Sequence, residues 1–203
     1  MSAKVALETP LLSFEVDILE LCQVLRDFVG VSLDADARKA LKEMIVEVDK
    51  NFQLVVEVLT PLYAINTAAD FRERWPELFR KFKTQYLSKW HSLSTRCGIV
   101  SQHLQRIQSA HDWKRRLPVL RNAVKRLDDI GDRWMANDAK LYEAMNGFMQ
   151  STNNALMSVN GHRSTPAKAL KEIQAVLRGT EKTLLQIKAY SNELELISAR
   201  LTP

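Results

Sequence analysis

The chain has 203 residues, of which 46% are hydrophobic and 26% are charged, and its formal net charge at pH 7 is +5. This composition excludes the low hydrophobicity of intrinsically disordered chains, and the length is enough to bury a substantial core. Only six glycines and six prolines are present, too few for the frequent turns of an all-β fold of this size. We therefore expect one helical domain, residues 1–203, that folds unaided.

The amino-terminal residues and the cysteines bear on the cellular compartment. Residues 1–10 carry one lysine and no apolar segment typical of a signal peptide, and no stretch approaches ~18 uncharged apolar residues. Cys22 and Cys97 each fall on or beside an apolar helical stripe, so we expect neither a disulfide framework nor a zinc site. These features predict a cytoplasmic protein without a cofactor or metal.

The first helix is predicted from a series of apolar residues at alternating intervals of three and four. The series runs from Leu11 to Phe28. Thr9 is the expected N-cap, Pro10 the first helical residue and Gly30 the stop.

The second helix is predicted after Asp34, where a similar series runs from Leu41 to Leu62. Pro61 is expected to bend or restart this helix. Residues 54–65 contain only one charged residue, Glu57, but they are too few to span a membrane. We interpret them as a buried core segment.

The third helix is predicted from an aromatic-rich series that begins at Trp75 and ends at Ile107. Thr67 or Asp70 is the expected cap, and the helix is expected to continue from Pro76 to Ser109. Aromatic residues three and four apart lie on one helical face, where they are more often core than a platform for stacking nucleic-acid bases.

Two further series predict the last two helices. The fourth helix starts at Leu117 and continues toward Val159, where Asn160 and Gly161 are expected to end it. The fifth helix is expected to start at residues 164–166 and to end near residue 201.

These series share a seven-residue period and are joined by short connections. Short links between long helices make neighbours antiparallel, and the period favours shallow crossing angles. The apolar stripes are wider than the two-position seam of a coiled coil, which favours a closed bundle over an open rod. The predicted fold is all-α: an up-and-down antiparallel bundle of about five long helices.

Charge is unevenly distributed along the chain. Residues 1–71 contain 12 acidic and 6 basic residues, whereas residues 72–126 contain 3 acidic and 14 basic ones. A basic ridge over residues 72–126 is a candidate surface for phosphates of nucleic acid or of anionic lipids. The candidate anion-binding residues are Arg80, Lys81, Lys83, Lys114, Arg115, Arg116, Arg121, Lys125 and Arg126. Alternatively, the acidic first two helices compensate the ridge within the fold.

The common sequence motifs of metal sites and nucleotide-binding sites are absent. The sequence lacks Glu-x-x-His, HExxH, CxxC, a glycine-rich nucleotide fingerprint and a P-loop. The dipeptide His111–Asp112 also occurs in HD phosphohydrolases, but the further ligands that those enzymes need do not follow in order. We therefore expect no metal centre.

Two Arg and His pairs resemble the active-site motif of HEPN ribonucleases, which are small all-α proteins. Arg106 and His111 fit R-x4-H, and Arg96 and His103 fit R-x6-H. The resemblance covers these few residues and implies metal-independent RNA cleavage. The alternative is an exposed arginine with a histidine near the last carbonyls of a helix.

Gly131 and Asp138 interrupt the apolar series of the fourth helix. A core carboxylate is costly unless it is paired. A local shift of the series through Ile130 and Met135 would instead leave Asp138 at the surface.

Regular heptads without a catalytic constellation favour a non-enzymatic interaction module, an adaptor or scaffold that binds a protein partner. Binding of RNA, DNA or an anionic membrane through the basic ridge is the alternative, and an HEPN-like ribonuclease is a minor one. The sequence does not indicate an oligomeric state.

Overall fold

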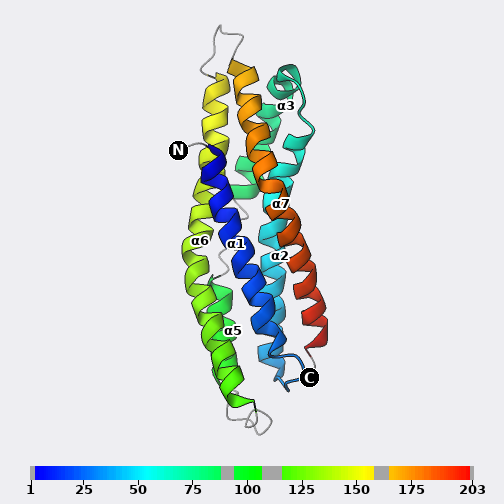
Figure 1. Ribbon diagram of the computed structural model, residues 1–203, viewed down its shortest axis with the longest axis vertical. Coiled ribbons are helices and arrows are strands. Elements are labelled where there is room, and N and C mark those ends of the chain that lie inside the picture. Colours follow the sequence, from blue (N-terminus) through cyan, green and yellow to red (C-terminus); the bar gives the residue numbers. More distant parts are fainter. Residues whose placement is uncertain (1–2, 88–93, 107–115, 158–164, 202–203) are drawn as a thin grey trace. The chain divides into compact units, whose positions relative to one another are not determined.

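The computed structural model describes residues 3–87, 94–106, 116–157 and 165–201, and every regular element in these ranges is helical (Figure 1). The elements are α1 (Ala3–Arg26), α2 (Ala35–Tyr63), α3 (Ala68–Lys81), the π-helix η1 (Phe82–Tyr86), α5 (Ser94–Arg106), α6 (Leu117–Met157) and α7 (Thr165–Arg200). The helices pack as a bundle. The predicted all-α helical bundle is therefore confirmed.

The chain divides into two compact units. Unit 1 comprises Met1–Leu12, Asn51–Trp90 and Ala139–Leu185, and unit 2 comprises Ser13–Lys50, His91–Asp138 and Gln186–Pro203. The helices α1, α2, α6 and α7 contribute a segment to each unit, α3 and η1 belong to unit 1, and α5 belongs to unit 2. That residues 1–203 form one domain stays a prediction.

The first helix begins earlier than the sequence suggested. α1 starts at Ala3, so Pro10 lies inside the helix and Thr9 is not its N-cap. Leu7 is fully buried and continues the stripe of Leu11 and Phe14 by one further turn. Burial of this side chain favours the longer helix, although a proline inside a helix removes one backbone hydrogen bond.

One glycine turn and two side-chain caps lie at helix ends near positions where the sequence predicted breaks. Gly30 has a φ of 76°, a conformation that glycine adopts without strain, and it follows the last turn of α1. The Asp34 carboxylate accepts a hydrogen bond of 2.7 Å from the backbone N–H of Ala37 at the start of α2. Thr67, one of the two expected caps, accepts a bond of 3.1 Å from the N–H of Asp70.

The third predicted helix contains a π-turn that the sequence did not indicate. After α3, the N–H of Leu87 donates to the carbonyl of Phe82, five residues earlier. The hydroxyl of Thr84 donates to the carbonyls of Arg80 (3.0 Å) and Lys81 (3.4 Å). These two carbonyls thus gain a side-chain donor at the point where the α-helical backbone hydrogen bonds give way to those of the π-helix. The expected unbroken helix to Ser109 includes residues 88–93 and 107–109, which lie outside the described ranges.

The aromatic stripe of unit 1 is part of the core. Phe71, Trp75, Phe82 and Tyr86 are buried, and Phe79 is half-buried. Successive ring centroids lie 5.1 to 6.5 Å apart. Such contacts are typical of core aromatics. The interpretation as core is confirmed for the four buried residues, whereas Phe79 is only half-buried and Trp90 lies outside the described residues.

In unit 2, α1 and α6 run antiparallel, because Asp17 contacts Arg133 and Glu20 contacts Arg126. Residues later in α1 thus contact residues earlier in α6. Asp138 on α6 is only 6% exposed, so it belongs to the buried seam. The suggested shift of the seam to Met135 is wrong, because Met135 is exposed.

In the same unit, α1 and α7 run parallel. The Cys22 thiol donates to the carbonyl of Tyr190 at 3.5 Å, and Arg26 forms an ion pair with Glu193. Burial raises the pKa of the Cys22 thiol to about 12, so it stays protonated and behaves as a small apolar side chain. The side chain of Cys97 lies outside the described set.

Candidate functional site

The predicted basic ridge is divided between the two units. Arg80, Lys81 and Lys83 belong to unit 1, whereas Arg116, Arg121, Lys125 and Arg126 belong to unit 2; Lys114 and Arg115 lie outside the described residues. Each part of the ridge therefore has its own surroundings. That these residues bind an anion stays a prediction.

In unit 1, three exposed basic residues lie along one side of α3 and η1. Arg72 and Lys83 are separated by close to three helical turns, whereas Arg80 is rotated by about 80° from Arg72 around the helix axis. We call these three residues the α3 basic face. Neither arginine forms an ion pair with any residue in the described ranges. The Lys83 ammonium lies 5.0 Å from the centroid of the Phe79 ring, in the range of a cation–π contact.

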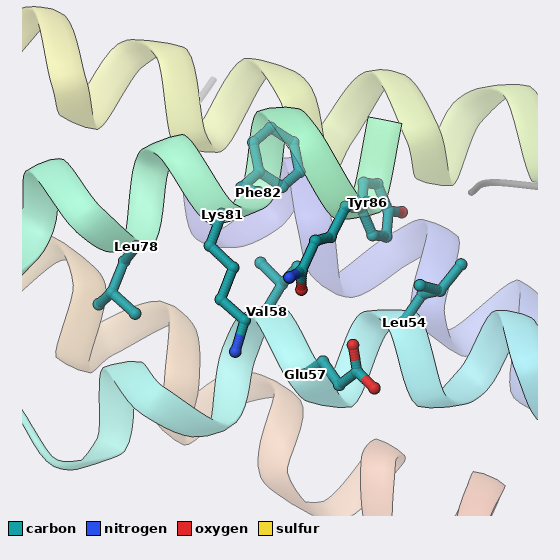
Figure 2. A pocket seen from close by; sticks show the side chains of 8 residues that line it. Leu54, Glu57, Val58, Leu78, Lys81, Phe82 and Tyr86 are labelled. Carbon is teal, nitrogen blue, oxygen red and sulfur yellow. The ribbon is translucent and has the colours of Figure 1, made fainter. Parts of the chain in front are cut away.

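Lys81 lies on the other side of α3, at a narrow cleft against α2 (Figure 2). Figure 2 shows its side chain reaching from α3 toward α2, whose Glu57 lies on the same rim. Leu54, Val58 and Phe82 line the cleft, which encloses about 10 Å³. This volume is of the order of one water molecule. The cleft is thus too small for an organic substrate, and Lys81 is not part of the α3 basic face.

In unit 2, the ridge is partly compensated by acidic residues. The Arg126 guanidinium lies 3.4 Å from the Glu20 carboxylate and 3.3 Å from the amide oxygen of Gln23 on α1. Arg121 and Lys125 are exposed, and Asp128 continues their side of α6 one turn later. The expected compensation by the first helix therefore holds for Arg126.

Arg133 of α6, which the sequence alone did not single out, contacts two acidic residues of α1. Its Nε donates to the Asp17 carboxylate at 3.2 Å, and its guanidinium also pairs with Glu20. Asn137 donates to the other Asp17 oxygen at 2.8 Å. Burial raises the pKa of the Asp17 carboxyl, and these donors oppose that shift. The position of Asp17 three residues after Phe14, on the apolar stripe, was the available signal in the sequence.

A larger cleft of unit 2 lies between the ends of α1 and α7. Its volume is about 330 Å³, and it is lined by Arg26, Val29, Glu193, Leu196, Ile197 and Arg200. Leu196 is 63% exposed, whereas Ile197 is buried. The Arg26–Glu193 ion pair joins the two walls. The cleft thus combines an apolar centre with arginines at the rim, the composition typical of protein interfaces.

Each of the two candidate catalytic pairs has one member outside the described side chains. Arg106 is exposed at the end of α5 and His103 is half-buried, but His111 and the side chain of Arg96 lie outside the described residues. Among the side chains that are described, no three His, Cys, Asp or Glu residues come close enough to hold a metal ion. The resemblance to HEPN ribonucleases therefore stays untested.

Within the described residues, no helix combines the length and the apolar character that crossing a bilayer requires.

Comparisons of the chain with protein-family models, with curated proteins and with solved structures found no match.

Proposed function

We propose that this protein is a helical-bundle interaction module that binds a helix of another protein at the α1/α7 cleft of unit 2. The observation that carries the proposal is Leu196, a large apolar side chain that is 63% exposed at the edge of a cleft with an apolar floor. The apolar residues Val29 and Ile197 line the same cleft. A contiguous apolar patch of this kind is characteristic of docking surfaces.

The lining residues favour an apolar anchor flanked by an acidic residue. An aliphatic side chain of the partner would contact Val29, Leu196 and Ile197, and full burial of such a side chain stabilises a complex by roughly 1.5–3 kcal/mol. Arg200 is exposed at the rim and forms no ion pair with any described residue. Its guanidinium can accept a bidentate carboxylate. A helix docked in a groove supplies both groups at neighbouring turns.

Leu196→Asp tests this function, with Leu185→Asp as the matched control. Leu185 is 65% exposed on the same helix but does not line the cleft. Partners would be captured with the wild type, identified by mass spectrometry and purified, and the affinity of each variant for them would be measured by fluorescence anisotropy. We expect a partner that Leu196→Asp binds at least about ten-fold more weakly and that Leu185→Asp retains. Equal affinity of both variants for every partner would contradict the proposal.

Binding of an anionic surface is the second candidate, because Arg121 and Lys125 are exposed on α6 and Arg116 is exposed just before it. Titration of labelled mixed-sequence RNA at low and near-physiological salt, followed by a gel of the same samples, distinguishes the candidates. Salt-sensitive binding to intact RNA that Arg121→Glu weakens would favour this function. RNA cleavage would instead favour the ribonuclease alternative.

A further inference from the structure

We infer that the molecule docked at the α1/α7 cleft of unit 2 is a second copy of this chain, whose α7 lies parallel to α7 of the first copy. The inference rests on the proposed function and names the partner at the same cleft. A helix that fits the cleft needs an exposed aliphatic side chain beside a carboxylate. On α7 itself, Leu196 is 63% exposed, and Glu195 next to it is exposed as well. The chain therefore carries both groups that its own cleft would accept.

The outer side of α7 in unit 2 has the spacing of a coiled-coil seam. Leu196 lies nine residues after the buried Ile187, two and a half turns later and thus on the opposite side of the helix. The seam residues follow at alternating intervals of three and four and are exposed and uncharged: Ala189, Asn192, Leu196 and Ala199. Ala189 and Leu196 then occupy heptad position a, and the other two occupy position d.

The charged residues beside this seam favour a second copy of α7 as the occupant. In a parallel pair, the residue before each a position faces the residue after the next d position of the other helix, five residues later. Lys188 would face Glu193 of the second copy, and Glu195 would face Arg200 of the second copy. Both pairs join a base to an acid, and two-fold symmetry forms each of them twice. In this orientation α7 is complementary to itself.

Glu195 and Arg200 are available for such a contact. Both are exposed, and neither forms an ion pair with a residue in the described ranges. Arg200 lines the cleft, so the Glu195 carboxylate of the second copy would meet its guanidinium at the rim, where a bidentate contact can form. Glu193 already contacts Arg26 within the chain. The Glu195–Arg200 pair is therefore the more informative one to test.

The apolar contact is centred on Leu196. In this register the two Leu196 side chains face each other, and each reaches Val29 and Ile197 in the cleft of the opposite copy. Leu185 precedes Leu196 by about 16 Å along the helix and belongs to unit 1, so the contact does not need it. Because few large apolar side chains take part, we expect weak self-association, with a Kd in roughly the micromolar range.

The test measures self-association of the full chain by sedimentation velocity at about 1 to 100 µM protein. Glu195→Arg and Arg200→Glu each turn the symmetric pairs into repulsions, so each variant alone should dimerise at least about ten-fold more weakly than the wild type. A 1:1 mixture of the two variants restores opposite charges and should dimerise within about three-fold of the wild type. The matched controls, Asp132→Arg and Arg121→Glu, make the same charge changes at exposed sites of α6 in unit 2 and should dimerise like the wild type.

Three results would overturn the inference. These are a wild type that stays monomeric up to about 100 µM, equal dimerisation of the wild type and both α7 variants, and a mixture of the variants that does not restore the dimer. The proposed function is judged separately, on the affinity of Leu196→Asp and Leu185→Asp for captured partners. A monomeric wild type with a partner that only Leu196→Asp loses would overturn this inference and leave the proposed function standing.

Discussion

Two groups of basic residues from the same basic part of the sequence have different surroundings. The arginines of the α3 basic face make no ion pair within the described residues, whereas Arg126 and Arg133 of α6 contact acidic residues of α1. We call Arg126 and Arg133 the α6 basic pair. The charge of a sequence segment therefore does not indicate which of its residues are available to a ligand. The acidic side chains on the neighbouring helix decide that.

The largest expected effect on stability concerns the buried aromatic stripe of unit 1, which lies on the same helix as the α3 basic face. Trp75 is buried within the aromatic stripe, so Trp75→Ala should lower the free energy of unfolding by roughly 3–5 kcal/mol. Urea denaturation followed by circular dichroism measures this. Phe79→Ala is the control and should cost less, because Phe79 is half-buried. Unchanged stability together with a loss of RNA binding would mean that the aromatics are a base-stacking platform.

The next effect concerns the α6 basic pair. Arg133→Met removes a donor from the buried Asp17 carboxylate, and at pH 7 we expect a loss of ~2 kcal/mol, discounted because the Arg133 side chain is 43% exposed. Arg121→Met on the same helix is the control. Equal losses from both variants would contradict the assigned role of Arg133.

The loss of stability caused by Arg133→Met should depend on pH. The pKa of Asp17 is raised in the folded state, mainly by burial, so protonated Asp17 favours folding and that contribution is lost as the pH rises through the folded pKa. Without Arg133 the carboxylate loses a donor and its pKa rises further. The cost of Arg133→Met should therefore be small near pH 3 and larger at pH 7. A cost that does not change with pH would show that Asp17 is not the affected group.

A smaller effect is expected at the second member of the α6 basic pair. The Arg126–Glu20 ion pair is partly exposed, so Arg126→Met should lower the unfolding free energy by about 0.5 kcal/mol. Raising the salt concentration should reduce this difference, since exposed ion pairs are screened. A loss as large as that of Arg133→Met would mean that Arg126 has a further buried partner.

The smallest effect is expected at Lys83. Lys83→Met removes a cation–π contact at an exposed site and should change the unfolding free energy by no more than ~0.5 kcal/mol. A large loss of stability would mean that Lys83 holds the fold and is not available to a partner.

The sequence predicted the helices well because their stability depends on local periodicity and capping. The alternating intervals of α6 and α7 and the Thr67 cap were visible without a structure. The start of α1 at Ala3 was missed, because Pro10 is typical of a first turn and the contribution of Leu7 depends on tertiary burial. The π-turn was missed because its aromatic spacing also fits an α-helix.

The site was less predictable, since it depends on contacts between helices. The basic residues were found, but the separation of Lys81 from the α3 basic face depends on the position of α2. Arg133 lies outside the most basic segment, and its role comes from Asp17 on a distant part of the sequence. Leu196 does not belong to the buried apolar series of its own helix, so the sequence does not mark it as a site residue. The cleft that it lines forms only because α1 packs beside α7.

The most direct test compares two charge reversals in urea denaturation at pH 7. Arg80→Glu with Lys83→Glu should leave the free energy of unfolding within about 0.5 kcal/mol of the wild type, because both side chains are exposed. Arg126→Glu with Arg133→Glu should lower it by several kcal/mol, about 3 or more, because each new carboxylate faces the acidic residues of α1. Equal effects of the two reversals would contradict the conclusion that the α6 basic pair stabilises the fold while the α3 basic face contributes little to its stability.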